Sequence, residues 1–197
     1  MSGYGTERAA IVHNHYMFRL QYRPDAALVL LEEGNAAEIY DLVHHDREYL
    51  AEWLPWVDMT HSTADIVVFI RRSLEQFAHN DGFHAGVLHE GRICGFIGLK
   101  PIDWTNRKVE IGYWLGASYQ GKGLMTDACR AIIDYAFREW RLHRIEIRVA
   151  VGNRRSAAIP ERLGFTLEGT HRQAQRMRER WLDIQMFGLL AEQWNSH

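Results

Sequence analysis

The sequence predicts a single α/β domain, and three patterns carry this prediction. Short runs of alternating apolar and polar residues, clearest at 109–115 and 145–149, are typical of half-buried strands. Apolar residues between Met125 and Trp140 recur at intervals of three and four, as on one face of a helix. Residues 83–109 hold two apolar runs separated by short turns, which indicates antiparallel strands. A chain of 197 residues is long enough for these elements to share one core.

The N-terminal part is predicted to begin with a loose leader. Residues 1–24 mix Gly, His, Tyr and Arg without a period, so we assign them no regular structure and place the single domain at 25–197. Residues 27–31 are apolar and predict a first strand. Asn35 then has the side chain and the position to N-cap a helix that runs towards Trp53.

A second helix and a strand meander are predicted next. Ser62 and Asp65 have the spacing of a capping box, and the apolar positions after them share one helical face until Gly82. Residues 83–88 and 93–102 predict an antiparallel hairpin. The remaining strands are expected at 109–115, 145–149, 165–168 and 181–190, and the remaining helices at 125–140 and 156–163.

Composition excludes several classes of protein. The apolar stretches are broken by charge well before the ~20 residues that a membrane helix needs, so we expect a soluble, cytoplasmic protein that does not contact membranes. Residues 1–100 carry 14 acidic and 8 basic side chains and residues 101–197 carry 11 and 15, which gives −6 and +4 and a total of −2. This asymmetry suits a polyphosphorylated small ligand and is too weak for direct binding of nucleic acid.

No metal site is predicted. Cys94 and Cys129 lie among apolar neighbours, so we expect them in the core rather than in a disulfide or a thiolate site. The histidines show no ligand spacing on a recognisable helix face. Solvated or structural roles are expected for His13, His15, His44, His45, His84 and His89.

The loop between the strand at 109–115 and the following helix has the properties of an anion site. Unpaired backbone N–H groups and the positive end of a helix dipole meet there, and Gly121 and Gly123 let the backbone approach a phosphate. Residues 116–123 also match a Walker A pattern except at the last position, where Gly123 replaces the Ser or Thr that binds magnesium. Among phosphate-binding functions, a nucleotide triphosphatase is therefore not the favoured one and is kept as the second candidate. The structural alternative to any anion site is a plain turn that needs positive φ.

The motifs around this loop resemble the GNAT superfamily of acetyl-CoA-dependent N-acetyltransferases, and within it the RimJ/RimL-type ribosomal-protein N-terminal acetyltransferases. The resemblance covers roughly residues 25 to 192 and implies a mixed, mostly antiparallel sheet of about seven strands flanked by helices. It implies acetyl-CoA as cosubstrate and no metal. The matching segments are Glu-Ile-Gly-Tyr-Trp-Leu at 110–115, Gln-Gly-Lys-Gly-Leu-Met-Thr at 120–126, Asn-Arg-Arg-Ser at 153–156, Glu-Arg-Leu-Gly-Phe at 161–165 and Trp-Leu-Pro-Trp at 53–56.

The resemblance also implies which residues bind the coenzyme. Asn153 would hydrogen-bond the pantetheine arm, and Ser156 would lie near the thioester sulfur. Met125 departs from the family, which usually has Gly or Ala there, and Gln175 stands where the RimL branch has a carboxylate. The pantetheine would run along the backbone of Ile111, Gly112, Tyr113, Trp114 and Leu115, and the pyrophosphate would bind the amides of Gln120, Gly121, Lys122, Gly123 and Leu124.

Glu110 and Ser156 are the candidate catalytic residues. By strand alternation Glu110 points away from the apolar face, and it resembles the catalytic Glu on the corresponding strand of other GNAT enzymes. An ordinary strand carboxylate paired with Lys108 or Arg148 is the alternative. The Ser156 hydroxyl would protonate or solvate the leaving thiolate, and a simple N-cap is its alternative role. The backbone N–H groups of residues 111–113 would polarise the thioester carbonyl.

An N-terminal α-amine is the favoured acceptor. Its pKa of ~7.7–8 makes deprotonation at neutral pH cost less than about 1 kcal/mol, against roughly 4 kcal/mol for a lysine. The family points to a ribosomal-protein N-terminus and to a homodimer. An aminoglycoside or polyamine acceptor, or a non-catalytic acyl-CoA-binding module suggested by Gln175, remains as an alternative.

Aromatic and basic side chains suggest two further roles in acceptor binding. Trp53 and Trp56 would form an acceptor wall or belong to the core. A group of arginines surrounds a predicted turn and would either meet an acidic acceptor or decorate a solvated hairpin tip; its members are Arg172, Arg176, Arg178 and Arg180.

Overall fold

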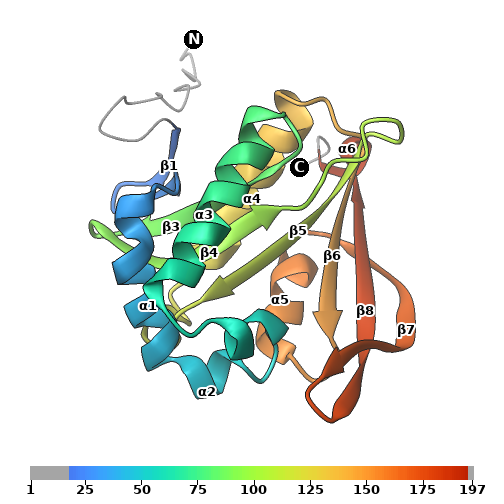
Figure 1. The fold of residues 1–197 in the computed structure, drawn as a ribbon. Coiled ribbons are helices and arrows are strands. Elements are labelled where there is room, and N and C mark those ends of the chain that lie inside the picture. Colours follow the sequence, from blue (N-terminus) through green and yellow to red (C-terminus); the bar gives the residue numbers. More distant parts are fainter. Residues whose placement is uncertain (1–17, 195–197) are drawn as a thin grey trace.

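The computed structural model describes residues 18–194, which form one eight-stranded sheet with helices on both faces (Figure 1). The strands are β1 (Arg19–Arg23), β2 (Ala26–Leu30), β3 (Phe83–His89), β4 (Arg92–Leu99), β5 (Lys108–Leu115), β6 (Arg144–Ala150), β7 (Thr166–Met177) and β8 (Arg180–Leu190). Their order in the sheet is β1-β2-β3-β4-β5-β6-β8-β7. Among the described strands only the β5–β6 pair is parallel, so the sheet is mixed and mostly antiparallel, as predicted.

Two groups of helices cover opposite faces of the sheet. The helices are α1 (Ala36–His45), α2 (Arg47–Leu50), α3 (Thr63–Ala78), α4 (Leu124–Arg138), α5 (Arg154–Arg162) and α6 (Ala191–Trp194), with 3-10 turns η1 (Glu33–Asn35), η2 (Pro55–Met59) and η3 (Ala117–Tyr119). Apolar residues of α1 and α3 pack with Trp114 on one face, whereas those of α4 and α5 pack with Val109 and Ile111 on the other. The alternation predicted for 109–115 is therefore confirmed, because neighbouring residues of β5 enter different cores.

The sheet opens between β5 and β6. These strands pair only over Lys108–Ile111 and Arg144–Ile147, and from Gly112 onwards β5 pairs with β4 alone. The unpaired edge of β5 then faces the first turn of α5 across a gap that side chains only partly fill. This opening positions the candidate site.

The structure differs from the sequence prediction at the N-terminus. Residues 19–23, assigned above to the loose leader, form β1, and the rest of the leader, residues 1–17, lies outside the described residues. Leu20 and Tyr22 pack against the core while Arg19 and Gln21 alternate with them, but an alternation over five residues is too short to stand out in the sequence.

Helix boundaries agree in most places. The capping box between Ser62 and Asp65 is confirmed at the start of α3. Asn35 caps differently from the prediction, because its side chain accepts the N–H of Glu32 and closes η1 rather than α1. None of the helices between residues 18 and 194 combines the length and the apolarity that a membrane crossing requires.

Candidate active site

Two cavities meet at the opening between β5 and β6. The first, of about 680 Å³, lies beside the 120–123 loop and is named here the loop cleft. The second, of about 500 Å³, lies on the face that Glu110 and Gly112 share and is named the aromatic cavity. Both are lined by Trp53, Leu54, Tyr113, Trp114, Asn153 and Ser156. A ligand in the loop cleft therefore reaches a ligand in the aromatic cavity at these residues.

Free amides line the loop cleft. Gly121 has φ of +74° and Gly123 has φ of +77°, a left-handed conformation that side-chain-bearing residues rarely adopt. Neither glycine is crowded, because an added Cβ would meet nothing within 4 Å. Within residues 18–194, the N–H groups of Gly121, Lys122 and Gly123 donate no hydrogen bond. They stand at the N-terminus of α4, so the predicted anion site has the required geometry.

The side chain of Lys122 points away from this site. Its ammonium lies 5.6 Å from the centre of the Tyr119 ring, and its carbonyl accepts a hydrogen bond of 3.1 Å from Arg23. Lys122 does not line the loop cleft, whereas Gly121 and Gly123 do. A Walker-type lysine has to reach the phosphates directly, so this orientation speaks against the nucleotide triphosphatase.

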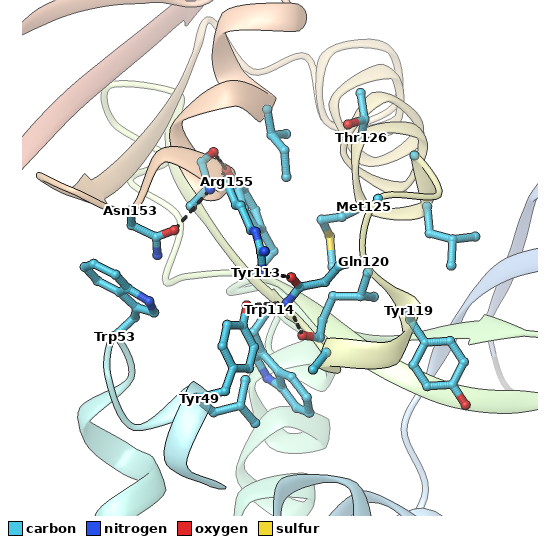
Figure 2. A pocket seen from close by; sticks show the side chains of 18 of the residues that line it. Tyr49, Trp53, Tyr113, Trp114, Tyr119, Gln120, Met125, Thr126, Asn153 and Arg155 are labelled. Carbon is cyan, nitrogen blue, oxygen red and sulfur yellow. Dashed lines mark hydrogen bonds between the residues drawn. The ribbon is translucent and has the colours of Figure 1, made fainter. Parts of the chain in front are cut away.

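Gln120 joins the two sides of the loop cleft (Figure 2). Arg155 donates to its Oε1 at 2.7 Å, and its Nε2 donates to the hydroxyl of Tyr49. Arg155 is exposed and has no acidic partner in the described chain. Its guanidinium therefore adds a positive group to a cavity whose floor already offers amide hydrogens.

The junction of the two cavities is organised by Tyr113, Asn153 and Ser156. Asn153 Oδ1 accepts the N–H of Ser156 at 3.2 Å, so Asn153 and not Ser156 is the N-cap of α5. Pro160 has no N–H to offer the Ser156 carbonyl four residues earlier. The Tyr113 hydroxyl donates to that carbonyl instead, at 2.9 Å, and lies 3.5 Å from Ser156 Oγ. Burial raises the pKa of Tyr113 above its usual value, so the hydroxyl stays protonated.

The backbone residues predicted to bind the coenzyme fall into three groups. Tyr113, Trp114 and Leu115 line the loop cleft. Gly112 lines only the aromatic cavity, and Ile111 is buried in the core and lines neither. Of the loop itself, Gln120, Gly121, Gly123 and Leu124 line the loop cleft, as does Met125 on the inner side (Figure 2).

Glu110 lies in the wall of the aromatic cavity. Its side chain is 19% exposed and forms an ion pair with Lys100, not with Lys108 or Arg148. Asp65 also lines this cavity, but it accepts hydrogen bonds from the His61 N–H and from Ser62, which hold the pKa of its carboxyl below the usual range. Glu110 is thus the carboxylate of this cavity that is not committed to capping a helix.

The β7–β8 hairpin closes one side of the aromatic cavity. Gln175 Nε2 donates to the Trp53 carbonyl at 3.3 Å, and Arg180 donates to the Glu52 carbonyl at 3.2 Å. Arg178 forms a two-bond ion pair with Asp58, with both distances 2.7 Å. Two of the predicted arginines therefore tie the hairpin to the loop after α2, and Gln175 lies in the cavity without being able to act as a base.

Several lining residues were not singled out by sequence reasoning. Trp53 and Trp56 do line the aromatic cavity, but Phe69, His84 and Phe96 stand beside them. No sequence motif marks these three, since Phe69 and Phe96 occupy ordinary helix and strand positions and His84 was expected to be solvated or structural.

Histidines, acidic residues and cysteines do not cluster as metal ligands in the described part of the chain. No group of three or more His, Cys, Asp or Glu side chains is arranged to hold a metal ion among residues 18–194. Cys94 and Cys129 are free and buried, and burial raises the pKa of the Cys94 thiol to about 12.

Comparisons with known proteins agree with this geometry. The family model described as "Acetyltransferase (GNAT) domain" matches residues 26–166. The putative ribosomal N-acetyltransferase YdaF of Bacillus subtilis is 37% identical over 182 residues, which cover 91% of this chain and 99% of that protein. The ribosomal-protein-serine acetyltransferase of Escherichia coli is 26% identical over 162 residues, covering 81% and 89%. A microcin self-immunity acetyltransferase solved with acetyl-CoA and AMP has a TM-score of 0.84 at 26% identity, covering 87% of this chain and 95% of that one.

Proposed function

The chain belongs to the GNAT acetyltransferase family and transfers acetyl groups from acetyl-CoA to an amine, and on that premise we propose that its acceptor is the N-terminal α-amine of a ribosomal protein. The observation that carries the proposal is the contact of two cavities at Tyr113, Asn153 and Ser156. One cavity offers backbone amides for a diphosphate, and the other offers room and a carboxylate for an amine. A ribosomal acceptor would be met in the cytoplasm.

The residues of the loop cleft fit the coenzyme. Amides at 121–123 would hold the pyrophosphate at the positive end of α4, and Arg155 would add a charge-assisted contact after releasing Gln120. Asn153 keeps its Nδ2 for the pantetheine while its Oδ1 caps α5. When bound, the thioester supplies the acetyl group, and the rest of the coenzyme leaves as a thiolate.

Glu110 is the proposed base. An α-amine loses its proton at a cost below about 1 kcal/mol at neutral pH, so a carboxylate acting through water is sufficient. The ion pair with Lys100 fixes the Glu110 side chain in the cavity wall. Gln175 occupies the place expected for a different carboxylate, and its amide holds the Trp53 loop instead.

Ser156 and the edge of β5 would stabilise the charge that develops. From Gly112 onwards β5 has no partner on its β6 side, so N–H groups on that edge are available to a carbonyl oxygen. The Ser156 hydroxyl, held beside the Tyr113 hydroxyl, would donate a hydrogen bond to the leaving thiolate, which then takes its proton from water.

The test is an acetylation assay with purified full-length chain, acetyl-CoA and peptides that carry ribosomal-protein N-termini. Thiol release gives the rate, and mass spectrometry gives the acetylated position. We expect Glu110→Gln to lower kcat by roughly 100-fold or more without changing the Kd of acetyl-CoA. Glu33→Gln is the matched control, because Glu33 is also paired with one cation, Arg71, and lies outside both cavities.

Other outcomes would assign the chain differently. Acetylation of spermidine or an aminoglycoside, with no peptide used, would identify a small-molecule enzyme. Tight acetyl-CoA binding without transfer to any amine would identify a binding module. Calorimetry with ATP and magnesium separates the nucleotide triphosphatase, and sedimentation velocity tests the homodimer that the family suggests.

A further inference from the structure

A continuous row of aromatic rings lines the aromatic cavity. The ring centres of Trp56 and Trp114 are 5.8 Å apart, and those of Trp114 and Phe96 are 5.0 Å apart. Phe96 stacks on Phe69 at 5.5 Å, and Phe69 meets the His84 ring edge-on at 4.9 Å. All five residues line the cavity. The row comes from η2, α3 and three strands, so its continuity is a property of the fold.

A glycine leaves the hollow in front of these rings. Gly98 and Gly112 are direct partners in the β4–β5 pair, and both line the cavity. Partners in an antiparallel pair point to the same face; the His84 ring fills the place above Gly98, and the place above Gly112 stays open. On one side of the hollow lies the Phe96–Trp114 pair, and on the other lies the Lys100–Glu110 ion pair.

The two glycines differ in what a side chain would do. A Cβ on Gly98 would collide with the His84 ring, which lies over that backbone. A Cβ on Gly112 would meet nothing within 4 Å, so it would enter open space. Gly112 can therefore carry a larger side chain without disturbing the core, and that side chain would reduce the cavity.

The charge of the cavity argues against a polycationic ligand. Its two carboxylates, Glu110 and Asp65, are each engaged, and Lys100 and Arg148 balance them. His84 is neutral, because burial lowers its pKa to about 4, and its Nδ1 has no hydrogen-bond partner among residues 18–194. Cavities built from aromatic rings with few charges bind large apolar or aromatic groups.

We propose that the aromatic cavity binds an aromatic group attached to the acceptor amine, and that Gly112 sets the size of group that fits. The proposal rests on the acetyltransferase function proposed above. In a peptide acceptor the group is the first side chain, and in a small molecule it is an aryl ring a few bonds from the nitrogen. The amine would lie at the junction near Ser156, with the ring over Gly112, where the space is open.

The experiment compares peptides that are identical except for the first residue, which is phenylalanine, tyrosine, tryptophan, serine or alanine. Phenethylamine and spermidine form a second arm. We expect kcat/KM for the phenylalanine-first peptide to exceed that for the serine-first peptide by roughly 10-fold to 100-fold, from burial of one ring. If phenethylamine is acetylated as efficiently as the phenylalanine-first peptide, the natural acceptor is a small aromatic amine. Spermidine should be a poor acceptor.

Variants at Gly112 make the test specific. Gly112→Leu should lower the phenylalanine-to-serine ratio of kcat/KM at least tenfold, and Gly112→Ala should lower it less. The ratio cancels any change in coenzyme binding. Gly34→Leu is the matched control, because Gly34 also has open space around its missing Cβ and lies outside both cavities.

Equal or better use of the serine-first peptide, or a ratio unaffected by Gly112→Leu, would overturn the proposal. If no amine is acetylated, the proposed function fails. Peptide binding measured by tryptophan fluorescence still tests whether the aromatic cavity binds an aromatic side chain, since Trp56 and Trp114 line it. Binding of the phenylalanine-first peptide that Gly112→Leu weakens tenfold would support the proposal. Equal binding of phenylalanine-first and serine-first peptides would contradict it.

Discussion

The loop cleft and the aromatic cavity meet at Ser156, but they are built from different parts of the chain. The loop cleft takes its polar groups from the backbone of one continuous stretch, residues 115–127, with α5 as the opposite wall. The aromatic cavity takes its character from side chains of η2, α3, β3, β4 and β5. Backbone amides and glycines bind a common anion, whereas side chains from separate elements select one acceptor. Changes in the two cavities should therefore affect different steps.

The largest separate effect is expected in the loop cleft. Gly123→Val places a β-branched residue at φ of +77°, where even an unbranched side chain costs roughly 1–2 kcal/mol. Relief of this strain turns the amides away from the anion. We expect the Kd of acetyl-CoA to rise about 100-fold, equal to about 2.7 kcal/mol, as measured by calorimetry.

Gly91→Val controls for strain alone. Gly91 has φ of +79°, has the same open space around its missing Cβ, and lines neither cavity. It should lower the free energy of unfolding without changing the Kd. If both variants weakened acetyl-CoA binding equally, the effect of Gly123→Val would not come from the amides of the loop cleft.

The same contrast explains what the sequence could predict. The loop, the strand before it and α4 lie next to each other along the chain, so the glycines and the helical period were sufficient to place them. β7 was predicted only at its start, because nearly all of its residues are exposed and no apolar alternation marks it. Gln175 lies in the unpredicted part, and its contact with Trp53 joins positions far apart in sequence.

The aromatic cavity contains a titratable group that should make stability depend on pH. The pKa of His84 falls to about 4 from the ordinary 6.5, so between these values the unfolded chain binds a proton that the folded chain does not. The stability contributed by neutral His84 is complete above pH 6.5 and is lost as the pH falls towards 4. This loss amounts to about 2 kcal/mol of unfolding free energy between pH 7 and pH 5, and His84→Phe should remove it.

Urea unfolding of both proteins at several pH values measures the difference between them. The carboxylates titrate in both proteins and cancel. If the unfolding free energy of His84→Phe changed with pH as steeply as that of the unaltered protein, the imidazole would be protonated in the folded protein as readily as in the unfolded chain.

Tyr113 belongs to both cavities, and its role could not be derived from local pattern. The sequence predicts a role only for the Tyr113 backbone, in binding pantetheine. In the structure its hydroxyl donates a hydrogen bond to the Ser156 carbonyl, which Pro160 leaves without a helical partner. Tyr113→Phe should cost about 1 kcal/mol of stability, because a partly buried carbonyl loses its donor, and should lower kcat by displacing Ser156. Pro160→Ala restores an N–H, so in the Tyr113→Phe background it should recover most of the loss.

A double-mutant cycle measured by urea unfolding gives this coupling. Tyr22→Phe is the matched control, because the Tyr22 hydroxyl is buried without a partner in the described chain and its removal should not destabilise. Additive effects of Tyr113→Phe and Pro160→Ala would exclude the compensation.

The smallest effect is expected where the hairpin closes the aromatic cavity. The pair between Arg178 and Asp58 is exposed, so Arg178→Ala should change stability by less than about 1 kcal/mol. It should raise the KM of the acceptor about threefold at low salt, and the difference should vanish in 1 M salt, where the Debye length is about 3 Å. The Kd of acetyl-CoA should not change, because neither residue lines the loop cleft.

Arg71→Ala is the control, because it breaks a similarly exposed pair with Glu33 and should change neither the KM of the acceptor nor the Kd of acetyl-CoA. A rise in the Kd of acetyl-CoA for Arg178→Ala would mean that the two cavities are coupled and do not act on separate steps.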